Sequence, residues 1–84
     1  MAVTISNTPN PNALKFTVGR DVGGPTTFVA GTDDGDPLAV SILEIDGVAS
    51  MFMTADFVTL TKVPDASWET IAPVAQDVLE QHFA

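Results

Sequence analysis

Alternating apolar and polar positions predict two short strands near the start of the chain. Val3–Ser6 alternates, and so does Leu14–Val18, where Lys15 lies on the face opposite the apolar residues. Pro9 and Pro11 separate the two segments, and each proline lacks an N–H and favours extended geometry in the residue before it. The pattern therefore predicts two strands joined by a stiff connection.

The second half of the chain predicts a β-hairpin. Val48–Met53 is a continuous β-prone run, and Phe57–Thr61 alternates with Val58 and Leu60 on one face. The three residues Thr54–Asp56 separate the two runs, and strands joined by so short a turn are expected to pair.

Two segments have the apolar spacing of helices. The first is predicted over Pro37–Asp46, with Asp36 as N-cap and Gly47 after its end. The second starts at the cap Ser67, and Pro73 lies on its solvent side. The apolar side of the second helix is predicted to hold Ile71, Val74, Ala75, Val78, Leu79 and His82.

The remaining segment, Gly19–Gly35, is rich in Gly, Asp and Thr and predicts a long mobile loop. Its one apolar island, Phe28–Ala30, is compatible with a short edge strand. The element order is then β-β-α-β-β-α, within one domain of residues 1–84. Two helices with one apolar stripe each must cover a sheet, so we expect an α+β fold with both helices on one face of a largely antiparallel sheet.

Charge and composition remove several classes of function. The 84 residues carry 11 acids against three Lys and Arg, a net charge of −8, and contain no cysteine. Nucleic acid and anionic membranes are not expected as partners, because both need clustered Lys and Arg. Disulfides, thiolate nucleophiles and self-ligated iron–sulfur clusters need cysteine. Met1–Asn10 has no signal-like apolar run, so a cytoplasmic location is expected.

Two groups of polar residues are candidates for chemistry. Asp33, Asp34 and Asp36 could hold a divalent cation through carboxylate oxygens, or could form a solvated loop that ends in a helix cap. His82 is the only histidine, and a packing role is favoured over a ligand or acid–base role. Without a second histidine or a cysteine, neither a transition-metal set nor a catalytic triad can be completed, and no enzyme activity is predicted.

Several residues are candidates for binding a protein partner. Asn10 and Asn12 offer amides on a proline-stiffened loop beside Lys15, although the same amides could simply cap the turn. Asp56 has the same two interpretations in its own turn. Trp68 is expected mainly in the core, with a partner-facing position as the alternative. If the methionines rather than Phe52 face outward, they would form a soft binding surface made of Met51 and Met53.

Four blocks of sequence together form a specific pattern. They are Thr8–Phe16 (TPNPNALKF), Pro37–Val48, Phe52 with Asp56–Lys62, and Trp68–Val74. This pattern resembles the N-terminal domain of Nfu/NifU-like iron–sulfur scaffold proteins, over nearly the whole chain except Gly19–Gly35.

The resemblance implies a role in iron–sulfur cluster assembly or delivery. In that family the domain usually precedes a second domain whose Cys-x-x-Cys motif binds the cluster, and the present sequence reaches Ala84 without one. We therefore expect a non-enzymatic, monomeric accessory or partner-binding module. No cofactor is expected on this chain alone, and an iron–sulfur cluster could be held only through a partner. The expected partner is an iron–sulfur assembly protein or an apo-protein client.

Overall fold

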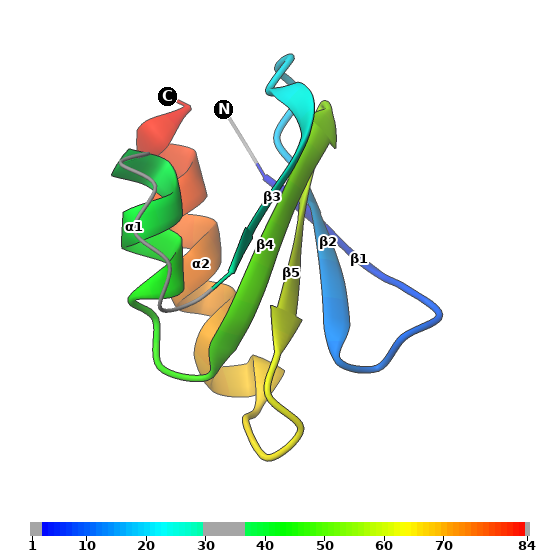
Figure 1. Cartoon of the computed structure of the whole chain (residues 1–84), viewed down its shortest axis with the longest axis vertical. Coiled ribbons are helices and arrows are strands. Elements are labelled where there is room, and N and C mark those ends of the chain that lie inside the picture. The colour runs from blue at the N-terminus through cyan, green and yellow to red at the C-terminus, as the bar shows by residue number, and fades with distance from the viewer. Residues whose placement is uncertain (1–2, 30–36, 84) are drawn as a thin grey trace.

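A five-stranded sheet forms one layer of the molecule and two helices form the other (Figure 1). The computed structural model describes residues 3–29 and 37–83. All neighbouring strands are antiparallel, in the order β1-β2-β5-β4-β3. The α+β fold expected from the sequence, with both helices on one face of the sheet, is therefore confirmed. The elements are β1 (Thr4–Asn7), β2 (Ala13–Thr17), β3 (Gly23–Val29), α1 (Pro37–Leu43), β4 (Val48–Ala55), β5 (Phe57–Lys62) and α2 (Trp68–His82).

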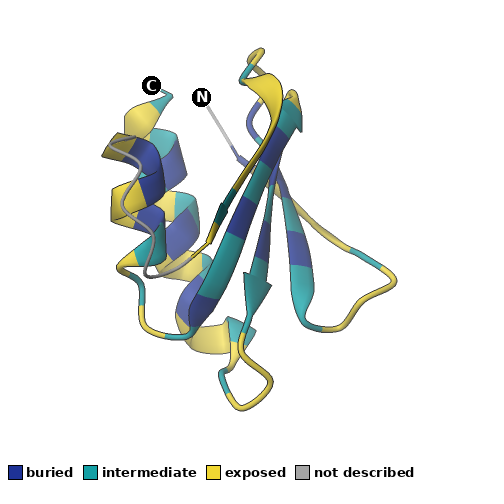
Figure 2. Ribbon diagram, viewed as in Figure 1, coloured by how far each residue is buried: buried dark blue, intermediate teal, exposed yellow. Residues whose placement is uncertain are grey.

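The three middle strands have one buried face and one half-buried face, as their alternating sequences predict. In β5, Val58 and Leu60 are fully buried, whereas the residues between them are half-buried. Register carries the same alternation across the sheet, because Leu60 pairs with Leu14 of β2 and with Met51 of β4. Figure 2 shows buried residues on these strands and on both helices, and together they form one hydrophobic core.

The prediction of a loop over Gly19–Gly35 is wrong for Gly23–Val29, which forms β3. The short edge strand that the apolar island Phe28–Ala30 allowed is confirmed at Phe28 and Val29, the end of β3, whereas Ala30 lies outside the described residues. This strand is an edge of the sheet and pairs with β4, with Thr27 opposite Phe52. Its sequence, GGPTTFV, has one half-buried position and no apolar alternation. The strand is held by backbone pairing to β4, a segment distant in the sequence, so local sequence carries little sign of it.

Helix α1 is shorter than predicted, since it ends at Leu43 rather than Asp46. The amide of Ile45 bonds the carbonyl of Ile42, an i−3 contact that tightens the last turn. Gly47 then has φ 98° and directs the chain into β4. The chain turns sharply at this glycine, as predicted, but only after the helix has already ended.

Helix α2 begins at the predicted cap, because the Ser67 side chain accepts a hydrogen bond from the Glu69 amide. Pro73 lies on the exposed side, as expected. The apolar side predicted for α2 included two residues too many, because Val74 is 48% exposed and His82 is exposed as well. Only the i, i+4, i+8 row faces the sheet directly, namely Ile71, Ala75 and Leu79.

The core lies between the sheet and the helices. Aliphatic side chains, two methionines and one phenylalanine fill it, and no polar side chain is buried among the described residues. The buried core residues are Val3, Leu14, Phe16, Val18, Leu38, Ala39, Ile42, Val48, Met51, Met53, Val58, Leu60, Ile71, Ala75 and Leu79.

Candidate functional site

The loop between β1 and β2 is held in one shape by its own side chains. The Thr8 hydroxyl lies 2.8 Å from the carbonyl oxygen of Asn10 and 2.9 Å from that of Ala13. The amide of Asn12 donates to the side-chain oxygen of Asn10 over 2.9 Å, and the amide of Ala13 donates to the Asn10 carbonyl. Asn10 thus has the turn-capping role that was one of its two interpretations.

Two hydrogen bonds from residues far along the chain fix the same loop to the rest of the molecule. The Lys62 ammonium donates to the side-chain oxygen of Asn12 at 3.1 Å. The indole N–H of Trp68 donates to the carbonyl oxygen of Pro11, also at 3.1 Å. Trp68 is half-buried and packs against the core at the start of α2. The loop is therefore preformed and leaves Asn10 and Pro11 exposed at the surface.

Lys15 lies in a different region, on the face of the sheet that the helices do not cover. Its ammonium group sits 4.4 Å from the centre of the Phe57 ring, within cation–π range. Asp56 precedes Phe57 in the β4–β5 turn and is exposed. Lys15 and Asp56 are thus near one end of β5, whereas the Asn10–Asn12 loop meets its other end at Lys62.

Met51 and Met53 are not available to a partner, so the sequence-based assignment of a methionine surface is wrong. Met51 is fully buried and Met53 is 8% exposed, and both pack in the core. Phe52 points to the opposite, uncovered face, where it is half-buried. Alternation separated the methionines from Phe52 correctly, but it could not tell which side the helices would cover.

The predicted site residues therefore do not form one cluster. The structure places Asn10 and Asn12 at one end of the sheet, Lys15 and Asp56 toward the other, and the methionines inside. The sequence did not indicate that Phe57 would support Lys15. The alternation of both strands put them on one face, but the pairing of Thr17 with Phe57 is a register that sequence alone does not supply.

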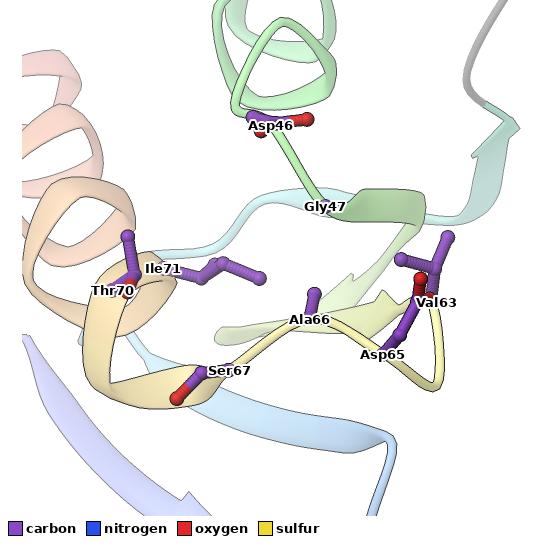
Figure 3. A pocket seen from close by; sticks show the side chains of 8 residues that line it. All are labelled: Asp46, Gly47, Val63, Asp65, Ala66, Ser67, Thr70 and Ile71. Atoms are coloured by element: carbon purple, nitrogen blue, oxygen red, sulfur yellow. The ribbon is translucent and has the colours of Figure 1, made fainter.

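A shallow pocket opens where the α1–β4 turn meets the start of α2 (Figure 3). Asp46 and Asp65 contribute carboxylates, and Ala66 and Ile71 give it an apolar floor. Gly47 is required for this close approach, because a Cβ there would lie 2.7 Å from that of Ala66. Two carboxylates alone do not amount to a metal site. The full lining is Asp46, Gly47, Val63, Asp65, Ala66, Ser67, Thr70 and Ile71.

No metal-binding cluster of three or more His, Cys, Asp or Glu occurs within residues 3–29 and 37–83. The exposed His82 ring meets the Phe83 ring edge-on, with centroids 4.8 Å apart. The acidic group of the alternative cation hypothesis, Asp33, Asp34 and Asp36, lies outside the described residues.

Comparison with known families agrees with this architecture. The family described as "Scaffold protein Nfu/NifU N terminal" matches residues 3–84. The chain belongs to this family. The resemblance inferred from the four sequence blocks is thereby confirmed.

Curated relatives in the Nfu/NifU family are much longer than this chain. The NFU1 iron–sulfur cluster scaffold homolog of Drosophila ananassae, named as mitochondrial, is 38% identical over 88 residues, which cover 100% of this chain and 31% of that protein. The mitochondrial NifU-like protein 4 of Arabidopsis thaliana is 41% identical over 76 residues, covering 87% of this chain and 27% of that protein. The chain spans about a third of the length of these relatives.

Solved structures show the same Nfu/NifU fold. The crystal structure of protein SAV1430 from Staphylococcus aureus has a TM-score of 0.80 and 37% identity, covering 95% of this chain and 100% of that one. The solution structure of a NifU-like protein from Saccharomyces cerevisiae has a TM-score of 0.79 and 30% identity, covering 94% of this chain and 75% of that one. None of the helices among the described residues is long and apolar enough to cross a membrane.

Proposed function

We propose that this chain is a non-enzymatic, partner-binding module of iron–sulfur cluster assembly. One observation carries the proposal: an Nfu/NifU N-terminal domain is matched over residues 3–84, and the sequence contains no cysteine. Thiolates are the usual ligands of iron–sulfur clusters. Whatever protein carries the cluster, its thiolate ligands lie outside these 84 residues, and this domain contributes by binding that protein.

The geometry supports binding rather than catalysis. The single histidine of the sequence is exposed and rests against Phe83, so it has no buried acid or nucleophile to orient among the described residues. By contrast, the β1–β2 loop is preformed and the sheet has an uncovered face with a fixed lysine. Preformed surfaces lose little conformational entropy on association, which favours a role in recognition.

The expected partner is a cysteine-bearing assembly scaffold or an apo-protein that receives a cluster. The cytoplasmic location expected from the sequence stays a prediction. The names of the curated relatives place those proteins in mitochondria.

A binding experiment with purified components tests the proposal. The chain is titrated into the cysteine-bearing scaffold protein of the same cell and, separately, into an apo-protein client, with affinity measured by calorimetry and iron measured in each component afterwards. We expect saturable binding to at least one of them, and iron only in fractions that contain the partner. Iron held stoichiometrically by the chain alone would overturn the proposal, as would the absence of binding to both proteins.

A further inference from the structure

One whole face of the sheet carries no helix (Figures 1 and 2). On the three middle strands its side chains are small hydroxyls or alanine, with two phenylalanines and one lysine. Register places Phe52 beside Thr59, and Thr59 beside Lys15, in a row across the strands. All these middle-strand positions are half-buried, and the small hydroxyl residues among them have few rotamers to lose on binding. This open face consists of Ala13, Lys15, Thr17, Ser50, Phe52, Thr54, Phe57, Thr59 and Thr61.

Charge is distributed unevenly between this face and the rest of the molecule. Within residues 3–29 and 37–83 every acidic residue lies in a loop, a turn or α2, and none lies on a strand. Lys62 is the other charged residue of the strands. It follows Thr61, so its side chain points away from the open face, and its ammonium group donates to the side-chain oxygen of Asn12. Lys15 is thus the one formal charge that the described strands place on the open face.

The ammonium group of Lys15 is fixed in position but has no anionic partner among the described residues. It sits over the Phe57 ring at 4.4 Å, and none of the described residues forms an ion pair or hydrogen bond with it. Asp56, which is adjacent to Phe57, is exposed at the rim. A complementary surface would bring a carboxylate over Lys15 and a basic group to Asp56, because like charges in either place would be repelled.

The size of the open face favours a transient contact. The three middle strands, about 4.8 Å apart and about 20 Å long, present roughly 300 Å² in plan. A stable complex of standard size buries about 800 Å² on each partner. A second copy is also disfavoured, because it would bring together two chains that each carry a net charge of −8.

We infer that the open face is a transient docking surface for a protein partner that places a carboxylate on Lys15 within an apolar patch covering Phe52 and Phe57. A basic residue of the partner faces Asp56. The inference rests on the proposed function, since it specifies where an iron–sulfur assembly partner binds and the surface chemistry that this partner must have.

The test uses the purified cysteine-bearing scaffold protein of the same cell as the probe. Amide shifts of the isotope-labelled chain are recorded during the titration, and affinity is measured for wild type and two variants. We expect shifts centred on Lys15, Phe52 and Phe57. Lys15→Glu should weaken binding by about tenfold or more, as the loss of a desolvated charge pair does. Phe52→Thr keeps a residue suited to strands and should also weaken binding by about tenfold.

Each variant has a matched control. Arg20→Glu reaches the same net charge as Lys15→Glu but lies off the open face, where Arg20 is exposed and its guanidinium donates to the Phe83 carbonyl oxygen, so it should change affinity by less than about twofold. Val74→Thr removes exposed apolar surface from α2 and should have as little effect. The dispersed amide spectrum of every variant checks that it is folded, and the wild-type shift map locates the interface without any substitution.

The other outcomes separate the two proposals. Binding with shifts confined to the helical layer, or equal losses for Lys15→Glu and Arg20→Glu, would overturn the docking surface and leave the proposed function intact. Open-face shifts that grow with the concentration of the chain alone would show a second copy as the occupant and overturn the inference. If neither the scaffold nor the apo-protein client binds, the proposed function fails, and the docking surface fails with it.

Discussion

The indole N–H of Trp68 donates a hydrogen bond to the carbonyl oxygen of Pro11, 57 positions earlier in the chain. The bond is 3.1 Å long and joins the first turn of α2 to the β1–β2 loop. It therefore links the helical layer to the edge of the sheet at a place where the chain itself provides no connection. The loop TPNPN is held from inside by Thr8 and from outside by this indole.

Trp68→Phe is expected to keep the aromatic packing and lose this hydrogen bond. The expected cost is about 1 kcal/mol of unfolding free energy, with any further loss coming from the smaller ring. Urea unfolding followed by circular dichroism measures it, because the variant has no tryptophan fluorescence. Amide shift changes should be concentrated in the β1–β2 loop and the start of α2. Unchanged stability, together with an unchanged spectrum of the loop, would show that the bond contributes nothing.

Gly47→Ala is expected to destabilise the fold strongly. The new methyl group would lie 2.7 Å from the Ala66 Cβ and 3.0 Å from the Ile71 Cδ1, in a backbone conformation with φ 98°. Steric overlap and backbone strain together suggest a loss of about 2–4 kcal/mol. The measurement is the midpoint of thermal or urea unfolding.

Gly19→Ala provides the matched control for Gly47→Ala. Gly19 also has positive φ, 73°, but an added methyl group there would meet no described atom within 4 Å beyond its chain neighbours. Only the backbone strain applies at this position, so the loss should be about 1–2 kcal/mol. Equal losses at the two glycines would contradict the steric argument for the close approach of the α1–β4 turn to α2.

Much of this fold follows from local patterns. The alternation in Phe57–Lys62 and the capping Ser67 each predict an element that the structure contains. Only the Phe28–Val29 end of β3 was expected, as a short edge strand, because the rest of GGPTTFV carries no apolar alternation and the strand's order comes from pairing with β4. The side chain of His82 was misplaced because one row of a helix, rather than its whole apolar half, contacts the sheet.

The candidate surfaces needed tertiary information. The sequence put Lys15 and Phe57 on particular faces of separate strands, but only the pairing of β2 with β5 brings the ammonium over the ring. In the same way, the helices decide that Met51 is interior and Phe52 is not. Which face of an alternating strand is covered depends on where distant helices pack, and that is a property of the whole fold.

Met51→Ala is expected to cost far more stability than Phe52→Ala, although phenylalanine is the larger residue. Met51 is fully buried, and removing a buried methionine side chain typically costs about 2–5 kcal/mol. Phe52 is half-buried on the open face, so its loss should be about 1 kcal/mol. Chemical unfolding of both variants under the same conditions compares them. A larger loss for Phe52→Ala would contradict the assignment of the two faces.

Thr8→Val is expected to loosen the β1–β2 loop while leaving the sheet intact. The Thr8 hydroxyl approaches two carbonyl oxygens and accepts from the Asn10 amide at 3.2 Å, and valine has nearly the same shape without these contacts. In the wild type, order parameters at Asn10 and Asn12 should approach the rigid value of about 0.85. They should fall clearly in the variant, with a loss of about 1 kcal/mol in stability. Thr59→Val is the control, because that hydroxyl makes no hydrogen bond among the described residues, and it should leave the loop unchanged. If the loop of Thr8→Val stays as rigid as that of the control, the prolines alone hold its shape, and the hydroxyl is not needed.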